Sequence, residues 1–219
     1  MTIKHHLTDD LLMAYAAGAL SEAFSLAVAT HISLCDECRA ALCAYEAMGG
    51  AILDSDLDGG DDLAPMSDDA LARAMARLDL PAPIAAPKKP KHPVLPAPLQ
   101  DYVGTDLSVI KWRKLGMGVR QAILPTKGKG GSARLLHIPA GQAVPDHGHR
   151  GMELTLVLKG AFRDETQHFA RGDIEIATEA DEHTPVALGD EDCICLAVTD
   201  APLRFNALIP RLMQPIFRI

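Results

Sequence analysis

The chain carries the stretch GQAVPDHGHRGMELTLVLKG at residues 141–160, and the spacing of its polar side chains is the most informative pattern in the sequence. His147 and His149 are two residues apart, so on a β-strand both side chains would point to the same face. Glu153 follows at the start of a strand-like apolar run and can add an oxygen ligand. The three side chains together predict a site that binds one metal ion.

Short strand-like runs surround this stretch from Trp112 onward. Residues 173–176 alternate polar and apolar side chains, and further strand-like runs cover residues 153–158 and 193–198. Glycines that favour turns separate these runs at positions 128, 130, 131, 141, 148, 160, 172 and 189. Many short strands at this spacing predict an antiparallel β-sandwich or barrel.

A fourth metal ligand is available in the same part of the chain. His183 comes at the end of another strand-like run. Three imidazoles and one carboxylate suit Zn, Fe, Mn, Ni or Cu. In the alternative interpretation, His147 and His149 are exposed loop histidines beside Pro145. We favour the metal site, because a complete ligand set in this order rarely arises by accident.

This pattern resembles the cupin family over residues 105–205. The spacing from Gly141 to Gly160 matches the first cupin motif at each defining position, and Gly172 and His183 match the second. The second motif is incomplete, since this chain departs from its usual Pro, Gly and Asn at Thr178, Ala180 and Ala187. All four ligand positions are filled nevertheless.

Cys193 and Cys195 are two residues apart on a predicted strand and therefore share a face. We interpret them as small buried apolar side chains. The alternative is a thiol pair that modulates the response of the β-domain.

Residues 8–78 show helical patterns instead. A first helix is expected from Thr8 to Ala17, a second from Ser21 and a third over residues 36–48, ended by Gly49 and Gly50. Residues 54–66 are rich in Asp and Gly and are expected to be mobile. Ser67 then begins a short amphipathic helix whose apolar stripe consists of Leu71, Met75 and Leu78.

A second metal motif lies between the second and third predicted helices. His31 precedes Cys35 by one helical turn, and Cys35 and Cys38 have the spacing with which two thiolates hold one tetrahedral ion. His6 or His5 is the source expected for the fourth ligand. Two sulfurs and two imidazoles favour a structural Zn²⁺. The alternatives are three residues buried in a helical core, or a redox pair formed by the two cysteines.

Proline marks the boundary between the two patterns. Residues 81–98 contain seven prolines, which fix φ and lack a backbone donor, so a semi-extended spacer is expected. The predicted organisation is an α+β multidomain chain. A zinc-binding bundle of three to four helices covers residues 1–80, a proline-rich linker residues 81–104 and a cupin-like domain residues 105–219.

Charge and composition narrow the class of protein. Residues 1–80 hold 14 acidic and 4 basic side chains, a net charge of −10, against +2 for the remainder. This negative charge disfavours direct binding of nucleic acid and would attract a partner with a basic surface. A well-solvated helical region without a partner would carry a similar charge. The sequence shows neither a signal peptide nor a membrane span. We expect a cytoplasmic protein with its five cysteines reduced.

The motif of His31, Cys35 and Cys38 with an upstream histidine resembles the zinc-binding anti-sigma domain of bacteria. Joined to a cupin domain, it resembles the ChrR-like family of anti-sigma factors over nearly the whole chain. That resemblance implies a zinc ion at one site and zinc or another divalent transition metal at the other. Carried over by position, the two ligand sets are His6, His31, Cys35 and Cys38, and His147, His149, Glu153 and His183.

The resemblance also implies a function. The helical domain would bind an extracytoplasmic-function sigma factor, with the fourth helix clasping it. The cupin domain would be required for release when singlet oxygen or organic hydroperoxides appear. No enzymatic activity is implied. The alternative is a cupin metalloenzyme, such as a dioxygenase, with a regulatory helical domain; a catalytic metal would keep one coordination position open.

Overall fold

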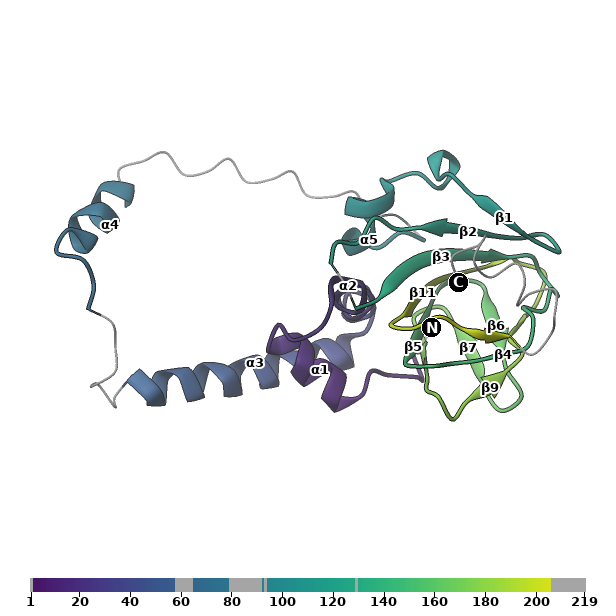
Figure 1. Ribbon diagram of the computed structural model, residues 1–219, viewed down its shortest axis with the longest axis horizontal. Coiled ribbons are helices and arrows are strands. Elements are labelled where there is room, and N and C mark those ends of the chain that lie inside the picture. Colours follow the sequence, from purple (N-terminus) through teal and green to yellow (C-terminus); the bar gives the residue numbers. More distant parts are fainter. Residues whose placement is uncertain (1, 58–64, 79–91, 93, 129, 206–219) are drawn as a thin grey trace.

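The computed structural model describes residues 2–57, 65–78, 92, 94–128 and 130–205. Helices near the amino end lie beside a β-domain formed by the later residues (Figure 1). Within the described residues, no helix is both long enough and apolar enough to cross a membrane. The arrangement is the predicted combination of a helical part and an antiparallel β-domain.

Five α-helices are found in the described residues; the first starts and stops where the sequence predicts, and the second starts where it predicts. Thr8 accepts a hydrogen bond from the backbone N–H of Leu11 and begins the first helix, while Gly18, at φ +66°, lies beyond its end. A glycine in this conformation closes a helix without steric cost. The helices are α1 (Asp9–Ala16), α2 (Glu22–Ile32), α3 (Asp36–Leu57), α4 (Ala70–Leu78) and α5 (Ala97–Val103).

The third helix is longer than predicted. Helix α3 continues through Gly49 and Gly50 to Leu57, so neither glycine ends it. Both keep a negative φ, and the helical hydrogen bonding continues through them. Each glycine costs a helix about 1 kcal/mol relative to alanine, which is too little to stop a helix that is already formed. Residues 54–57, part of the stretch expected to be mobile, are helical, while residues 58–64 of that stretch lie outside the described residues.

Most of the proline-rich stretch also lies outside the described residues, but its end does not behave as an extended spacer. Val94 and Leu95 are buried, and Pro96 caps helix α5. Pro98 occupies the first turn of that helix, where its missing N–H costs nothing. The last prolines of the stretch therefore start a helix that packs against α2.

Within residues 94–128 and 130–205, the β-domain contains three antiparallel sheets. The largest contains, in spatial order, β1 (Arg113–Gly116), β2 (Val119–Ile123), β3 (Ser132–Ile138), β11 (Cys193–Thr199), β5 (Glu153–Lys159) and β8 (Ile174–Ala177). A short 3-10 turn, η1 (Leu107–Val109), precedes it. The smaller sheets are β10 (Val186–Ala187), β6 (Ala161–Arg163) and β7 (His168–Ala170), and β12 (Arg204–Phe205), β4 (His147–Gly148) and β9 (Glu182–His183).

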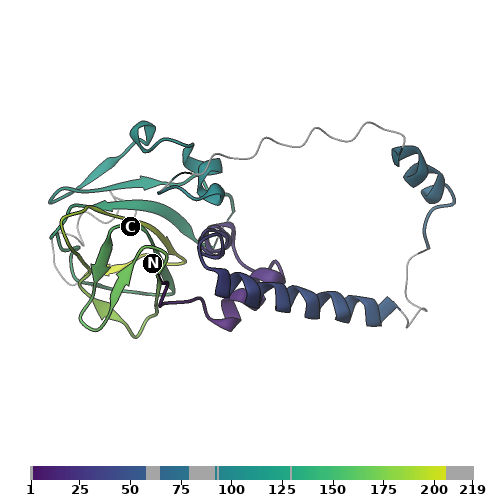
Figure 2. The same ribbon diagram turned by 180° about the vertical axis from the view of Figure 1, so that it is seen from behind.

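The central strands of the large sheet are buried on both faces. Along β5, Leu154, Leu156 and Leu158 belong to the apolar core shared with the helices, whereas Val157 belongs to the interior of the β-domain. Helix α2 contacts β11, β5 and β3, so it covers the outer face of the sheet (Figure 2). The helical part and the β-domain thus share one apolar core.

Hydrogen bonds also hold helix α2 against the residues that it packs on. Glu22, at the start of α2, accepts a hydrogen bond of 2.7 Å from the hydroxyl of Tyr102 in α5. Its second carboxylate oxygen accepts from the backbone N–H of Lys127, which precedes β3. These contacts lower the pKa of Glu22 and raise that of Tyr102 to about 12, the latter chiefly through burial. The Glu22 carboxylate therefore joins α2 both to helix α5 and to the segment that precedes β3.

Candidate metal centres

The structure brings together His6, His31, Cys35 and Cys38, whose donor atoms all lie within 4.8 Å of one another. Nε2 of His31 is 3.2 Å from Sγ of Cys38. Nδ1 of His6 is 3.3 Å from Sγ of Cys35 and 3.6 Å from that of Cys38. These separations suit the edges of a zinc tetrahedron, about 3.6 Å for ligand bonds of 2.0–2.3 Å.

Each donor of this cluster is positioned by the local fold. His31 lies in the last turn of α2, Cys35 immediately precedes α3, and Cys38 lies in its first turn. His6 comes from the segment before α1, and its Nε2 lies 3.5 Å from the Glu37 carboxylate, which leaves Nδ1 toward the cysteines. A helix end, a turn and an extended segment therefore converge on one point.

The protonation of this cluster suits a bound cation. Burial lowers the pKa of His31 to about 4, so its ring is neutral and can act as a ligand. Burial raises the pKa of the Cys38 thiol to about 11. A buried thiolate is therefore costly here unless a positive ion lies beside it, and a bound metal ion supplies that charge.

His5 is placed differently from His6. Its Nδ1 lies 3.5 Å from a carboxylate oxygen of Asp173, and its ring lies 4.4 Å from that of Phe169, centre to centre. Successive side chains of an extended segment point to opposite sides, so His5 faces the β-domain while His6 faces the cysteines. Of the two histidines that the sequence left open, the structure places His6 in the cluster.

The second cluster lies inside the β-domain. Donor atoms of His147, His149 and His183 all lie within 4.8 Å of one another, and Nε2 of His147 is 3.1 Å from Nε2 of His183. His147 and His183 face each other directly across strands β4 and β9. This pairing explains how a histidine 36 residues away reaches the motif.

Glu153 lies at the side of this cluster. Its Oε2 is 3.1 Å from Nδ1 of His149. It stands at the start of β5, where it pairs with Ala177 and Thr199. Burial opposes its charge, but the hydrogen bond from His149 and the three nearby imidazoles lower its pKa overall. The carboxylate is therefore ionised next to the rings and available to a cation.

Two further hydrogen bonds orient the rings toward a common point. Nδ1 of His147 donates to the carbonyl of Pro145 at 2.8 Å, and Nδ1 of His183 donates to Oε1 of Glu175, also at 2.8 Å. With Nδ1 protonated in both rings, both Nε2 lone pairs face the cluster. The two Nε2 atoms are 3.1 Å apart and lie with the nearest ring nitrogen of His149 within 4.8 Å, so one ion can contact all three, and the residues fit a metal ion.

Glu175 was not singled out in the sequence, although it lies in the alternating run at residues 173–176. Its side chain is buried and belongs with Asp164 and His183 to a third group of neighbouring donors. Burial raises the pKa of Glu175, an effect that the hydrogen bond with His183 opposes. An acidic residue in an alternating strand is normally solvated, and nothing in its own sequence context distinguishes this one.

Replacing Glu175 with alanine is expected to weaken metal binding at the histidine cluster by about 10- to 100-fold, because His183 loses the partner that fixes its ring and tautomer. A competition titration of the purified protein against a coloured chelator measures this. Glu179→Ala removes an exposed carboxylate of the following turn and should leave the affinity unchanged. Equal affinities for the Glu175 variant and the unmodified protein would contradict the assigned role.

The remaining cysteine pair lies in the core of the β-domain. Cys193 and Cys195 are fully buried, and their sulfur atoms are 3.4 Å apart. The hydrogen bond with Cys193, followed by burial, raises the pKa of the Cys195 thiol well above its ordinary value. A protonated, buried thiol is a poor nucleophile, which favours the interpretation as packed apolar side chains.

Comparison with known proteins supports the two-part reading of the chain. The family described as "ChrR Cupin-like domain" matches residues 100–202. The Anti-sigma-E factor ChrR of Cereibacter sphaeroides is 61% identical over 221 residues, covering 100% of both chains. The crystal structure of Rhodobacter sphaeroides SigE in complex with the anti-sigma ChrR contains a chain that is 59% identical, with a TM-score of 0.79; the match covers 91% of this chain and 100% of that one. The chain therefore belongs to the ChrR family of anti-sigma factors.

Proposed function

We propose that this protein binds an extracytoplasmic-function sigma factor and keeps it from RNA polymerase. The observation that carries the proposal is helix α4, none of whose residues is buried. Its stripe of Leu71, Met75 and Leu78 is exposed to 72%, 57% and 76%. Figure 1 shows this helix standing apart from the β-domain. An apolar helix face without a partner is suited to bind another protein.

Helix α3 presents further exposed apolar side chains. Its second half leaves Met48, Ile52 and Leu53 at least 60% exposed. Residues 1–80, which include both helices, carry a net charge of −10. A sigma factor uses basic surfaces to meet DNA and polymerase, so an acidic inhibitor would be attracted to them. The relative named above is found in complex with a sigma factor, SigE.

We further propose a metal ion at each cluster. Zinc would be held by His6, His31, Cys35 and Cys38, where it would fix α2 and α3 against the segment before α1. Zinc or another divalent transition metal would be held by His147, His149, Glu153 and His183. The corresponding division of the chain is residues 1–80 for the anti-sigma domain, 81–104 for the linker and 105–219 for the cupin domain.

The β-domain would have a regulatory role in the cytoplasm rather than a catalytic one. We propose that singlet oxygen or organic hydroperoxides act there and cause release of the sigma factor. Imidazole and thiolate ligands are electron-rich and oxidisable. The full-length similarity to an anti-sigma factor favours this over a cupin dioxygenase, because it extends through the helical part as well as the β-domain.

The proposal is tested with the full chain and a purified extracytoplasmic-function sigma factor. Mixed in equal amounts, the two are expected to elute as one complex in size-exclusion chromatography, and transcription that depends on the sigma factor should stop. A housekeeping sigma factor serves as the control and should elute separately. Transcription that continues in the presence of a saturating amount of the metal-loaded chain would refute the function.

A further inference from the structure

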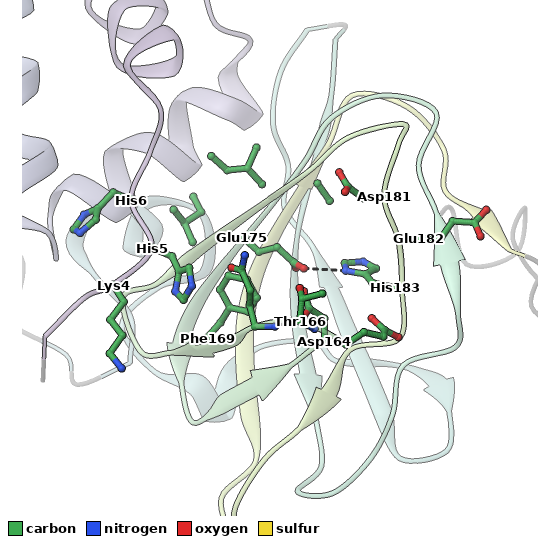
Figure 3. Close-up of a pocket in the computed structure, with 15 residues that line it drawn as sticks. Lys4, His5, His6, Asp164, Thr166, Phe169, Glu175, Asp181, Glu182 and His183 are labelled. Atoms are coloured by element: carbon green, nitrogen blue, oxygen red, sulfur yellow. Dashed lines mark hydrogen bonds and ion pairs between the residues drawn. The ribbon is translucent and has the colours of Figure 1, made fainter.

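A short segment near the amino end connects the two clusters through the β-domain. Residues 3–6 run along the turn between β7 and β8, and Figure 3 shows His5 beside Phe169, with Lys4 and His6 on either side of it along the segment. The backbone N–H of Ile174 donates to the carbonyl of His5 at 3.3 Å. This contact places the segment alongside β8 like an additional edge strand.

Asp173 holds this segment in place. Its Oδ1 accepts the backbone N–H groups of Lys4 at 2.6 Å and His5 at 3.0 Å. Its Oδ2 accepts that of Ala170 at 2.8 Å. The residue is only 2% exposed, and these three bonds lower its pKa although burial opposes the charge. An ionised, buried carboxylate with three backbone donors is a strong and rigid anchor.

Residues on either side of Asp173 in the sequence make further contacts, Gly172 with the amino-terminal segment and Glu175 with the histidine cluster of the β-domain. On one side, Gly172 lies so close to Ile3 that an added Cβ would come within 2.7 Å of Cδ1 of Ile3, and Asp173 binds the backbone of Lys4 and His5, the residues just before His6. On the other side, Glu175 accepts the hydrogen bond of His183. Four consecutive residues, which we call the bridging segment (residues 172–175), therefore contact the segment that carries His6 and the cupin-site histidine His183.

There is also room for movement beside this contact. A cavity of about 490 Å³ lies between residues 4–6 and the β-domain. It is lined on one side by the three residues of the amino-terminal segment and on the other by groups that include Glu175 and His183 (Figure 3). Residues 4–6 are thus held by the bonds to Asp173 and Ile174 and not by close packing on all sides.

We propose that the bridging segment transmits the state of the cupin metal site to the amino-terminal zinc site, with Asp173 as the positioning residue. When His183 loses its metal, Glu175 loses a fixed partner, and a shift of β8 moves Asp173 together with the backbone of Lys4 and His5. The next residue, His6, is a zinc ligand. This route crosses the junction directly and does not require the proline-rich stretch. The inference rests on the proposed function, since it needs both metals.

Cobalt distinguishes the two sites in the full chain. Only the amino-terminal cluster contains cysteines, so thiolate-to-cobalt charge-transfer absorption reports Co²⁺ at that site alone. The rate at which this absorption decays in excess chelator is measured for the unmodified protein and for His149→Ala, which empties the cupin site. We expect the two rates to differ by at least about fivefold, the lower end of ordinary coupling between sites.

The same pair of measurements in an Asp173→Ala background tests the route. The ratio of the two rates is expected to fall below about twofold, because the anchor that connects the sites is gone. A residue that only stabilised the fold would change both rates by the same factor and leave the ratio intact. Asp173→Asn, which has the same shape and retains one acceptor oxygen, should fold and reduce the ratio by at least about twofold. Asp192→Ala, which removes an acceptor of the Ala140 N–H elsewhere in the β-domain, should leave the ratio unchanged.

The outcomes separate the inference from the function on which it rests. Absence of charge-transfer absorption in the cobalt-loaded, unmodified protein would overturn the proposed zinc site itself. If the absorption is normal but its decay rate is the same in the unmodified protein and in His149→Ala, the proposed zinc site is supported and the coupling between the two sites is overturned. A ratio preserved in both Asp173 variants would overturn the assigned route.

Discussion

Replacing Cys38 with serine is expected to remove the amino-terminal metal ion and, with it, measurable binding of the sigma factor. A structural zinc contributes apparent binding energies of about 10–16 kcal/mol, while a whole domain is stable by only about 5–15 kcal/mol. Without the thiolate, His31 and Cys35 remain buried beside an incomplete site. The ends of α2 and α3 then lose the contact that joins them to His6.

Elemental analysis and binding titrations measure this effect. The variant should lose about one equivalent of zinc, and its affinity for the sigma factor should fall by more than about 100-fold, which corresponds to the loss of roughly 3 kcal/mol. Cys43→Ser is the matched control, because Cys43 lies in the same helix but is exposed. It should keep both the zinc and the affinity. Full inhibition by a zinc-free Cys38→Ser protein would disprove the structural role of the metal.

The second large effect is expected at helix α4. Changing Leu71 and Met75 together to aspartate should lower the affinity for the sigma factor by at least about 100-fold, because the most important anchors in an interface are worth about 2 kcal/mol or more each. Both side chains are exposed in the free protein, at 72% and 57%. Their replacement should therefore leave the thermal unfolding temperature within experimental error.

Isothermal titration calorimetry with the purified sigma factor measures the affinity of this double variant. Ala76→Asp adds one negative charge, half of that in the double variant, on the far side of the α4 stripe and should change the affinity by less than about threefold. If the double variant bound as tightly as the unmodified chain, the apolar face of α4 would not be the contact surface. Circular dichroism before and after mixing shows whether α4 stays helical in each protein.

Local spacing was sufficient to predict much of both metal centres. His147, His149 and Glu153 lie on strand β4, in the turn after it and at the start of β5, and His31, Cys35 and Cys38 lie close together in the same way across a helix junction. The backbone geometry of these short stretches directly controls where their side chains point. The antiparallel β-domain could also be predicted from the sequence, because alternating apolar runs and glycine turns are local signals.

Other features depended on contacts between distant residues. The end of α3 was wrongly predicted, because the local cost of Gly49 and Gly50 is smaller than the cooperativity of the helix around them. Glu175 carries no sequence signal of burial, since only the pairing of β8 with β5 brings it under the cluster. The choice between His5 and His6 likewise needed the position of residues 3–6 against Asp173.

The amino-acid sequence alone determined the kind of fold and every proposed donor except the one left open between His5 and His6, since these properties follow from the spacing of side chains along single helices and strands. Tertiary structure alone decided that α2 and the large sheet share one core and that residues 172–175 contact both the segment that carries His6 and the ligand candidate His183. The physical reason is that packing across a junction depends on the relative position of whole elements. No spacing within one element encodes that position, so the connection between the two centres became visible only in three dimensions.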